Sequence, residues 1–321
     1  MRALAAPPSD GPLLEPFRQC NVRLVPSAGV YCFRGSQLFS DEGAILSPDN
    51  RLFGEFVHHF DTVGLRQGPY FKPFRTFSPR VLRRNEWIAL LAAPEARNYY
   101  HWLFDVLPRL HLLAPYRDVL ELYAVPHGLS SVQRDSLRLL DVRPEQLLEL
   151  KPNQRLYCER LLVPSLPGSE GSTPDWSIEF LRSNFLRFAP RESGEPRRKI
   201  YISRVATQRR LVNEAALVEQ LTQHGFEVID PARLSFTEQI ACFRQASIVV
   251  AVHGAALANL VFADNCRVVE LFSPDYIRPD CYFTLSRQLG HDYRYTLGNS
   301  VPGQWGDLEV DVAQVVRLAT E

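Results

Sequence analysis

The hydrophobic pattern of the chain is clearest between residues 246 and 262. Residues 248–252 form a continuous apolar run that is mostly β-branched, and a turn of His253 and three small residues at 254–256 follows it. Such a run is typical of a parallel strand that is buried on both faces. Residues 257–261 then read as the opening of a helix. We therefore expect this strand to lie at the centre of a sheet.

Strand-like and helix-like patterns alternate on both sides of that strand. Before it, the pattern predicts strands at 87–92, 120–125 and 156–163, with helices near 98–113 and at 131–140. Around it, we expect strands at 199–203, 226–229 and 267–272, a helix at 214–224 and another that opens with a capping box at 235–238. This alternation indicates βαβ units and parallel sheets, and hence two α/β domains in tandem.

Composition shifts suggest where those domains begin and end. Residues 1–85 are rich in Pro and Gly and read as an irregular, β-rich lead-in to the first domain, with strand-like pieces at 29–33 and 51–56. The first domain is expected at 86–164 and the second at 199–321. Residues 165–198 hold two segments rich in Pro, Gly and Ser around one amphipathic helix near 176–188, which is typical of an interdomain connection.

The overall composition excludes some classes of partner. The chain has 321 residues, with 36 basic and 36 acidic side chains in balance, so no overall field favours nucleic acid. No apolar run approaches the ~18 residues of a membrane span, and we expect a cytoplasmic protein. Short basic clusters at 80–84 and 197–199 leave open a peripheral contact with the inner face of the membrane. The six cysteines form no CxxC pair, and we expect Cys242 and Cys266 to be buried thiols.

Candidate chemistry gathers at the expected carboxyl ends of the second domain's strands. Parallel sheets bind ligands outside those ends, where Arg204, His253 and Glu270 fall. Backbone amides of a small-residue turn at a helix N-terminus attract anions. A nucleotide diphosphate suits this rim, with Arg204 and the turn amides on phosphate and Glu270 accepting from ribose hydroxyls. The residues concerned are Arg204, Arg209, His253, Gly254, Ala255, Ala256 and Glu270.

Each of these residues also has a structural interpretation. The small residues of the turn equally permit close packing of helix on sheet, and a lone glycine-rich turn is a weak signal. An isolated arginine is more often a solvated surface charge. Glu270 is equally consistent with a salt-bridged or capping acid. A binding site is favoured only because all of these residues are expected together at the carboxyl ends of the strands.

The first domain has a polar strip on an otherwise apolar helix. On a helical wheel, Asn98, His101, Asp105 and Arg109 fall within about 80° of one another. We expect this strip to face a cleft, with Asn98 and Arg109 on the acceptor side. Asp105 is four residues from His101 and is able to orient its imidazole, although a purely structural bond is equally consistent. A proline at position 108 should kink or end the helix.

Four segments together resemble glycosyltransferase family 61: NYYHWLFDVLPRL, RKIYISR, VVAVHGAALANLVF and RVVELF, in this order. The resemblance covers roughly residues 85–300. It implies a GT-B fold, in which two Rossmann-like domains with parallel sheets face each other across a cleft. It also implies inverting transfer from a nucleotide sugar, usually a UDP-sugar such as N-acetylglucosamine, xylose or arabinofuranose. By motif, Arg204, residues 253–259 with Asn259, and Glu270 would hold the nucleotide. His101 and Asp105 would face the acceptor.

Two departures from the family pattern bear on the activity. Ala256 stands where many relatives have glycine, and we expect no secretory signal of the kind that the eukaryotic relatives have. We therefore expect a bacterial-type member that acts on a cell-surface glycan or its lipid-linked precursor. No convincing DxD motif is present, so we expect no metal and no cofactor besides the nucleotide sugar. Either Asp105 or His101 would be the general base.

Two other classes of protein compete with this hypothesis. A non-catalytic nucleotide-sugar sensor or scaffold on the same fold would need the second-domain rim but not the polar strip of the first domain. A Rossmann oxidoreductase or epimerase requires GxGxxG in an early βα turn, and the chain has no such motif. The transferase hypothesis therefore accounts for the most features of the sequence.

Overall fold

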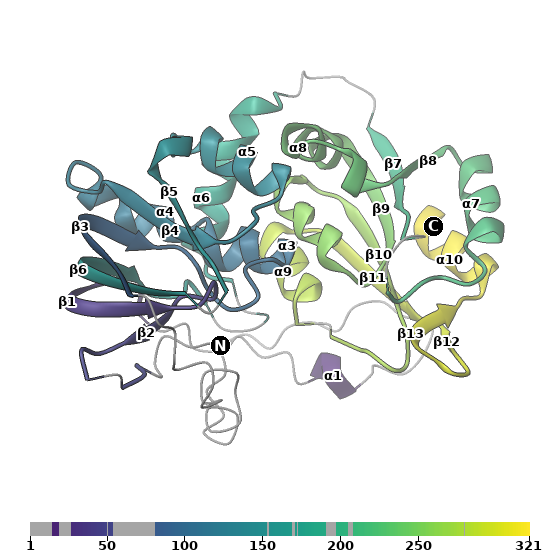
Figure 1. Ribbon diagram of the computed structural model, residues 1–321. Coiled ribbons are helices and arrows are strands. Elements are labelled where there is room, and N and C mark those ends of the chain that lie inside the picture. Colours follow the sequence, from purple (N-terminus) through teal and green to yellow (C-terminus); the bar gives the residue numbers. More distant parts are fainter. Residues whose placement is uncertain are drawn as a thin grey trace. The chain divides into compact units, whose positions relative to one another are not determined.

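The computed structural model describes residues 15–18, 27–49, 51–53, 81–152, 154–168, 171, 173–190, 197–204, 208–278 and 280–321 (Figure 1). The chain forms two compact units. Pro26–Gly168 make up the N-terminal unit, and Ser169–Glu321 together with Met1–Val25 make up the C-terminal unit. Each unit has its own sheet and is described by itself.

The sheet of the N-terminal unit has six strands in the order β2-β1-β6-β3-β4-β5. Strands β3, β4, β5 and β6 are mutually parallel, whereas β1 runs antiparallel to both β2 and β6. The sheet is therefore mixed, and the expectation of a wholly parallel sheet is wrong at this edge. The strands are β1 (Val30–Phe39), β2 (Ala44–Leu46), β3 (Val81–Leu90), β4 (Leu122–Pro126), β5 (Leu147–Leu150) and β6 (Arg155–Pro164).

The antiparallel edge follows from the segment that precedes the alternating part of the chain. Val30 pairs with Pro164 and Phe39 with Arg155, so β1 runs the length of β6. The predicted strand at 29–33 is therefore only the start of a longer one. Of the predicted strand at 51–56, Leu52 forms a single bridge to Leu46, and the residues after Phe53 lie outside the described ranges.

The helix predicted at 98–113 is divided into short pieces. Helix α3 (Tyr99–His101) passes into the π-helical turn η4 (Trp102–Val106), and α4 (Arg109–Leu113) begins after Pro108. The Leu107 amide donates to the Trp102 carbonyl at 3.0 Å, five residues back. Pro108 has no amide hydrogen to continue the helical pattern. The rest of this unit comprises η5 (Ala114–Tyr116), α5 (Ser131–Leu139) and η6 (Pro144–Gln146).

The sheet of the C-terminal unit is wholly parallel in the order β11-β10-β9-β7-β8. Strand β9 (Ala246–Val252) is its central member, which confirms the prediction from the apolar run. Strands β7 (Arg198–Ile202), β8 (Phe226–Ile229) and β10 (Arg267–Phe272) match the predicted ranges closely. Strand β11 (Asp292–Leu297) was not predicted, and its alternating polar residues suit the edge position that it takes. A hairpin of β12 (Asn299–Val301) and β13 (Gln304–Glu309) follows it.

Helices lie on both faces of this parallel sheet (Figure 1). The capping box that opens α8 is formed as predicted, between Ser235 and Glu238. Helix α6, expected in a connection, belongs to the C-terminal unit, where Phe185 packs edge-on against Phe236 at 4.9 Å. The helices are α1 (Glu15–Arg18), α6 (Asp175–Phe185), η7 (Leu186–Phe188), α7 (Glu214–Gln223), η8 (Pro231–Arg233), α8 (Phe236–Gln245), η9 (Ala255–Phe262), α9 (Tyr282–Leu289) and α10 (Val312–Thr320).

The side chain of Phe17 packs the N-terminal helix α1 against the C-terminal unit. Phe17 is 4% exposed and stacks on Tyr295 with ring centroids 4.2 Å apart. It also meets the rings of Phe272, Phe283 and Tyr293. No local pattern predicts this contact, because Phe17 and its partners are more than 250 residues apart in the chain.

Two of the cysteines are buried, as the sequence predicts. Cys242 and Cys266 are buried free thiols, and burial raises the pKa of Cys266 to about 12.

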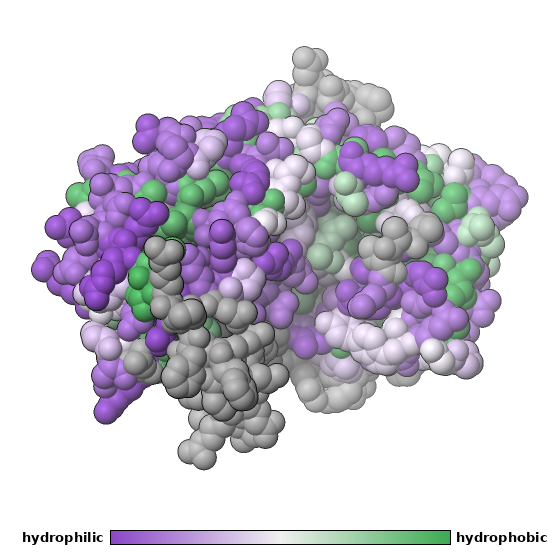
Figure 2. Space-filling model, in the orientation of Figure 1, coloured by the Kyte–Doolittle hydropathy of each residue, from purple (hydrophilic) through white to green (hydrophobic). Residues whose placement is uncertain are grey.

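The surface and the helices bear on a contact with membranes. Within the described ranges, every helix is too short or too polar to cross a membrane. On the face drawn in Figure 2, hydrophobic residues form small patches among hydrophilic ones. In the basic cluster at 197–199, Arg198 forms an ion pair with Glu227.

Candidate functional site

Strand order places two of the predicted residues at one position in the C-terminal sheet. In chain order, its strands follow the doubly wound arrangement 2-1-3-4-5, whose switch point lies between β7 and β9. Ligands of such sheets bind outside the carboxyl ends of the strands at the switch point. Arg204 follows β7 and His253 follows β9. The candidate site is therefore built on the part of the sheet where a ligand is expected.

Arg204 and Gly254 are in direct contact across this switch point. The guanidinium donates to the His253 carbonyl at 2.8 Å and to the Gln208 carbonyl at 2.9 Å. A β-carbon on Gly254 would lie 1.5 Å from Nη1 of Arg204. Gly254 has φ 177° and ψ 165°, an extended conformation that any residue adopts. Its missing side chain is therefore needed for the space that the Arg204 guanidinium fills, whereas the sequence had suggested space for a ligand.

Positive charge is concentrated beside this turn. Burial, and next the charge of Arg209, lower the pKa of Arg204 to about 10, so its guanidinium remains protonated at neutral pH. Arg209 holds its own guanidinium 4.7 Å above the ring of Tyr276. Both predicted arginines therefore lie in the loops at the carboxyl end of the sheet, close enough to influence each other's charge.

The segment after Gly254 is a 3₁₀-helix instead of the expected α-helix. It spans Ala255–Phe262, and every residue from Leu257 onward is buried. Among the residues that the structure describes, no side chain caps its N-terminus. The turn residues Ala255 and Ala256 are half-buried, and their amides are the first two of the helix. Amides at this position have no partner within the helix and favour an anion.

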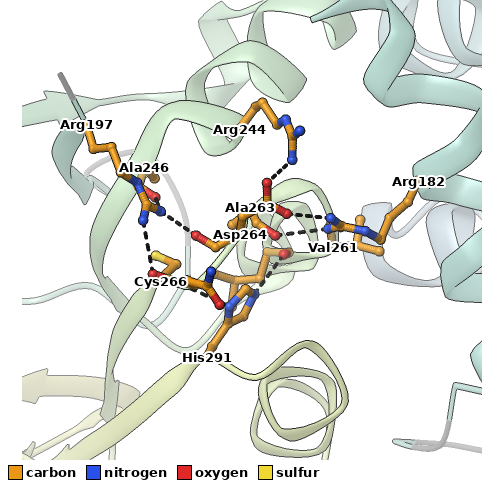
Figure 3. A network of polar contacts seen from close by, with 11 residues as sticks. Arg182, Arg197, Arg244, Ala246, Val261, Ala263, Asp264, Cys266 and His291 are labelled. Atoms are coloured by element: carbon orange, nitrogen blue, oxygen red, sulfur yellow. Dashed lines mark hydrogen bonds and ion pairs between the residues drawn. The ribbon is translucent and has the colours of Figure 1, made fainter. Parts of the chain in front are cut away.

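The opposite end of η9 is fixed by side chains that contact its last carbonyls (Figure 3). Arg182 donates to the carbonyls of Val261 and Ala263 at 2.7 and 2.9 Å, and His291 contacts the Leu260 carbonyl at 3.2 Å. Arg182 also pairs with Asp264 at 2.5 Å, and Arg244 pairs with the same carboxylate. These contacts satisfy the carbonyls at the negative end of the helix dipole. They hold η9 so that its N-terminus stays at the switch point.

Asn259 does not reach the surface. Its side chain is fully buried and donates to Gln239 Oε1 at 3.0 Å and to the Ala256 carbonyl at 3.2 Å. The expectation of a nucleotide contact is therefore wrong for this side chain. It fastens η9 to α8, and this contact supports the turn that carries Ala256.

Glu270 also lies deeper than the sequence predicted. Its side chain is fully buried. One carboxylate oxygen is 2.6 Å from Nδ1 of His253, and the other accepts from the Tyr293 hydroxyl. Both oxygens thus have protein partners, and the predicted bonds to ribose hydroxyls are not available to them. Glu270 instead sets the ring orientation of His253, as a carboxylate does for many functional histidines.

Aromatic rings surround the other faces of His253. Its ring stacks on Phe272 at 5.3 Å and meets Tyr276 and Tyr282 at 5.5 and 5.4 Å. Sequence reasoning missed Tyr276, Tyr282 and Tyr293. The only available signal was the density of aromatic residues between 276 and 295, just after the last predicted strand.

The N-terminal unit brings together the predicted histidine and aspartate. His101 Nδ1 and Asp105 Oδ2 are 2.6 Å apart, and their side chains are 18% and 12% exposed. Asp105 lies in the π-helical turn Trp102–Val106, which His101 directly precedes, and such turns recur at functional sites. A hydrogen bond from Nδ1 to the carboxylate leaves Nε2 of the imidazole as the atom able to accept a proton.

The other two residues of the polar strip have structural roles. Arg109 is 3% exposed and donates to the carbonyls of Leu91 and Pro164, which follow β3 and end β6. Burial lowers its pKa to about 10, although the charge of Asp105 raises it. Asn98 uses its side-chain oxygen to accept from the Tyr100 amide at 2.9 Å, and so caps α3. The predicted acceptor-side position is therefore wrong for Arg109, whose guanidinium fills the space between those strand ends.

Comparison with known proteins gives three kinds of match. The chain is 27% identical over 282 residues to an EGF domain-specific O-linked N-acetylglucosamine transferase of Drosophila melanogaster, covering 76% of this chain and 53% of that protein. It is 25% identical over 134 residues to a beta-1,2-xylosyltransferase of Arabidopsis thaliana, covering 37% and 23%. The chain thus spans about half the length, or less, of these relatives.

A solved structure, that of the dodecameric iron-containing heptosyltransferase TibC in complex with ADP-D-beta-D-heptose, aligns with a TM-score of 0.37 and 15% identity over 93% of this chain and 86% of that one. The family model described as Glycosyltransferase 61 matches residues 99–269, more than half of the chain. That range includes the His101–Asp105 pair, Arg204 and the His253–Gly254 turn. The chain therefore belongs to glycosyltransferase family 61.

Proposed function

We propose that this protein is an inverting glycosyltransferase. It transfers a sugar from a nucleotide sugar, in our proposal a UDP-sugar, to a hydroxyl of a glycan or lipid-linked glycan acceptor, and needs no metal. Membership of the family and the transferase relatives support an enzyme that acts on glycans. The observation that carries the nucleotide part is the Arg204 guanidinium on Gly254, beside the uncapped start of η9.

The cation and the helix start suit a leaving diphosphate. As the bond from the anomeric carbon to the diphosphate oxygen breaks, the electron pair passes to that oxygen. The growing negative charge needs donors that are already in place. Arg204 and the amides of Ala255 and Ala256 supply a protonated guanidinium and two backbone donors, so no metal ion is required for this step. The tandem α/β units agree with a GT-B enzyme, which we include in the proposal.

In this mechanism His101 is the general base. The acceptor hydroxyl gives its proton to Nε2 of His101 while its oxygen attacks the anomeric carbon from the side opposite the diphosphate, which inverts the configuration. Asp105 holds the Nδ1 hydrogen and stabilises the imidazolium that forms. We choose His101 over Asp105 because the carboxylate is the less exposed of the two and is already bonded to the imidazole.

The test is turnover of UDP-sugars in excess chelator, with and without glycan acceptors. The wild-type protein should release UDP under these conditions. His101→Ala should bind UDP normally but turn over roughly 10²- to 10⁴-fold more slowly, the range for loss of a general base. His111→Ala is the matched control, because His111 is an exposed histidine of the same unit.

Three results would count against the proposal. Strict dependence on added manganese would refute the metal-free mechanism, and near-normal turnover of folded His101→Ala would refute the assignment of the base. Binding of a UDP-sugar without any turnover, even with a broad acceptor set, would favour a non-catalytic sensor on the same fold.

A further inference from the structure

Trp305 is a large aromatic side chain that the fold holds in solvent. It lies in β13 and is 65% exposed, the highest value among the large hydrophobic side chains that the structure describes. Tryptophan combines a wide apolar surface with a flat ring, and it is enriched where proteins contact ligands and partners. The exposed position of Trp305 therefore makes it a candidate contact for a ligand or a partner.

The hairpin that carries Trp305 is firmly tied to the unit. Asp275 accepts from the Ser300 hydroxyl at 2.8 Å and from the Gly306 amide at 3.0 Å. Asp307 accepts from the Arg210 backbone amide at 2.7 Å and forms an ion pair with its guanidinium at 2.9 Å. These bonds lower the pKa values of both carboxyl groups. Trp305 is therefore presented on a rigid support.

Gly306 leaves space for the side chain of Arg209 beside the β12–β13 hairpin. Its φ of +81° favours glycine, and a β-carbon there would lie 2.8 Å from Cγ of Arg209. The Arg209 stem passes over Gly306 and places its guanidinium above the Tyr276 ring. The Tyr276 ring in turn meets Trp305 edge-on, with centroids 5.8 Å apart at 69°.

The same tyrosine links this aromatic surface to the proposed diphosphate site. The ring centroid of Tyr276 also lies 5.5 Å from that of His253. Tyr276 and the His253–Ala256 turn follow the carboxyl ends of the parallel strands β10 and β9, the edge at which such sheets bind ligands. Trp305 lies in the antiparallel hairpin that comes after the parallel strand β11. Two successive ring contacts thus separate Trp305 from the turn. In a nucleotide, a single ribose separates the base from the phosphates.

We infer that Trp305, Tyr276 and Arg209 form a stacking surface for the base of the nucleotide. This inference rests on the proposed function and assigns a site to the nucleobase. Every base has a flat π-face that stacks on an aromatic ring, and the Arg209 guanidinium above the Tyr276 ring supplies a cation beside it. The surface offers stacking, so it should hold the base whatever its hydrogen-bonding edge.

The test compares two ligands that differ in the base. UDP and inorganic pyrophosphate are titrated into the wild-type protein, Trp305→Ala and Trp305→Phe, in a metal-free buffer. Trp305→Ala should bind UDP roughly 5- to 100-fold more weakly, the range for one base stacked on an aromatic ring. Its affinity for pyrophosphate should be unchanged, and Trp305→Phe should recover most of the UDP affinity. Phe188→Ala is the control, because Phe188 is another exposed aromatic residue of this unit, at 39%.

The possible outcomes distinguish failure of the proposed function from failure of the stacking inference. Wild-type protein that binds neither UDP nor pyrophosphate would refute the proposed function itself. Wild-type protein that binds UDP, with unchanged affinity in Trp305→Ala, would overturn the stacking inference alone. Equal loss of UDP and pyrophosphate affinity would also overturn it, because the residue would then act through the fold. If UDP binding persists in Trp305→Ala and only the KM for a glycan acceptor rises, the surface binds sugar and the inference is wrong.

Discussion

Replacement of Gly254 by alanine should weaken nucleotide binding by moving Arg204, with little effect on the fold. The added methyl group would lie 1.5 Å from Nη1 and 2.7 Å from Cζ of Arg204. The guanidinium has to leave its place, because no rotation of a methyl group relieves such an overlap. The backbone at Gly254 is extended, so alanine itself fits without strain. The change therefore acts on the arginine.

The size of the effect follows from the bonds that are lost. Arg204 would give up its bond to the His253 carbonyl and its position beside the η9 amides. A hydrogen bond to a charged group contributes roughly 1.5–3 kcal/mol. Loss of one such contact to a phosphate lowers affinity roughly 10- to 100-fold. The end of a long side chain moves easily, so we expect the free energy of unfolding to change by no more than about 1 kcal/mol.

The assay is a double-mutant cycle on the Kd for UDP, measured by calorimetry without metal. If Gly254 acts through Arg204, then Gly254→Ala should cost nothing further in an Arg204→Ala background. Gly29→Ala is the control glycine, because a β-carbon there meets no atom within 4 Å and its φ is not positive. It should leave both affinity and stability unchanged.

Two results would refute the reasoning. Wild-type affinity in Gly254→Ala would show that the guanidinium is not needed where the structure has it. Additive losses in the double mutant would show that the glycine admits the ligand directly, as the sequence alone had suggested.

Three further predictions concern stability. Tyr293→Phe should lower the free energy of unfolding by about 1–3 kcal/mol, because a buried oxygen of Glu270 loses its donor; an unchanged urea midpoint would contradict this. Phe17→Ala should cost about 3–5 kcal/mol, the range for a buried phenylalanine, and equal midpoints would show that α1 contributes nothing. Burial lowers the pKa of His291 below its ordinary 6.5, so below pH 6.5 protons bind the unfolded chain in preference. Stability should therefore fall as pH falls from 6.5, and His291→Gln should flatten this part of the Tm profile; parallel profiles would contradict the assignment.

The sequence predicts the second sheet well, because its signals are local. The apolar run at 248–252 is buried on both faces and could lie only inside a parallel sheet. His253 is the first polar residue after that run, and Arg204 is the first charged residue after the strand at 199–203, so both were located from the strand ends. Strand β11 was missed for the opposite reason, because an edge strand needs no continuous apolar run.

The roles of individual site residues were harder to predict, because they depend on how deeply each side chain is buried. Glu270 and Asn259 have sequences around them that suit a ligand, yet both side chains are fully buried and bonded to protein. Arg109 shares a helical face with His101 and Asp105, but its length lets the guanidinium reach backbone carbonyls at two strand ends. A local sequence pattern does not show which distant carbonyls a long side chain contacts. Trp305 was missed because Tyr276 and the His253–Ala256 turn, which lie near it in the structure, follow other strands.

The most direct test of the account is a calorimetric titration of UDP into the wild-type protein and Arg204→Ala, in buffer with excess chelator. We expect micromolar binding of UDP to the wild-type protein and a loss of affinity of roughly 10- to 100-fold in Arg204→Ala, with the variant folded. Equal affinities in the two proteins, or wild-type binding only after a divalent cation is added, would contradict a metal-free diphosphate site built on Arg204.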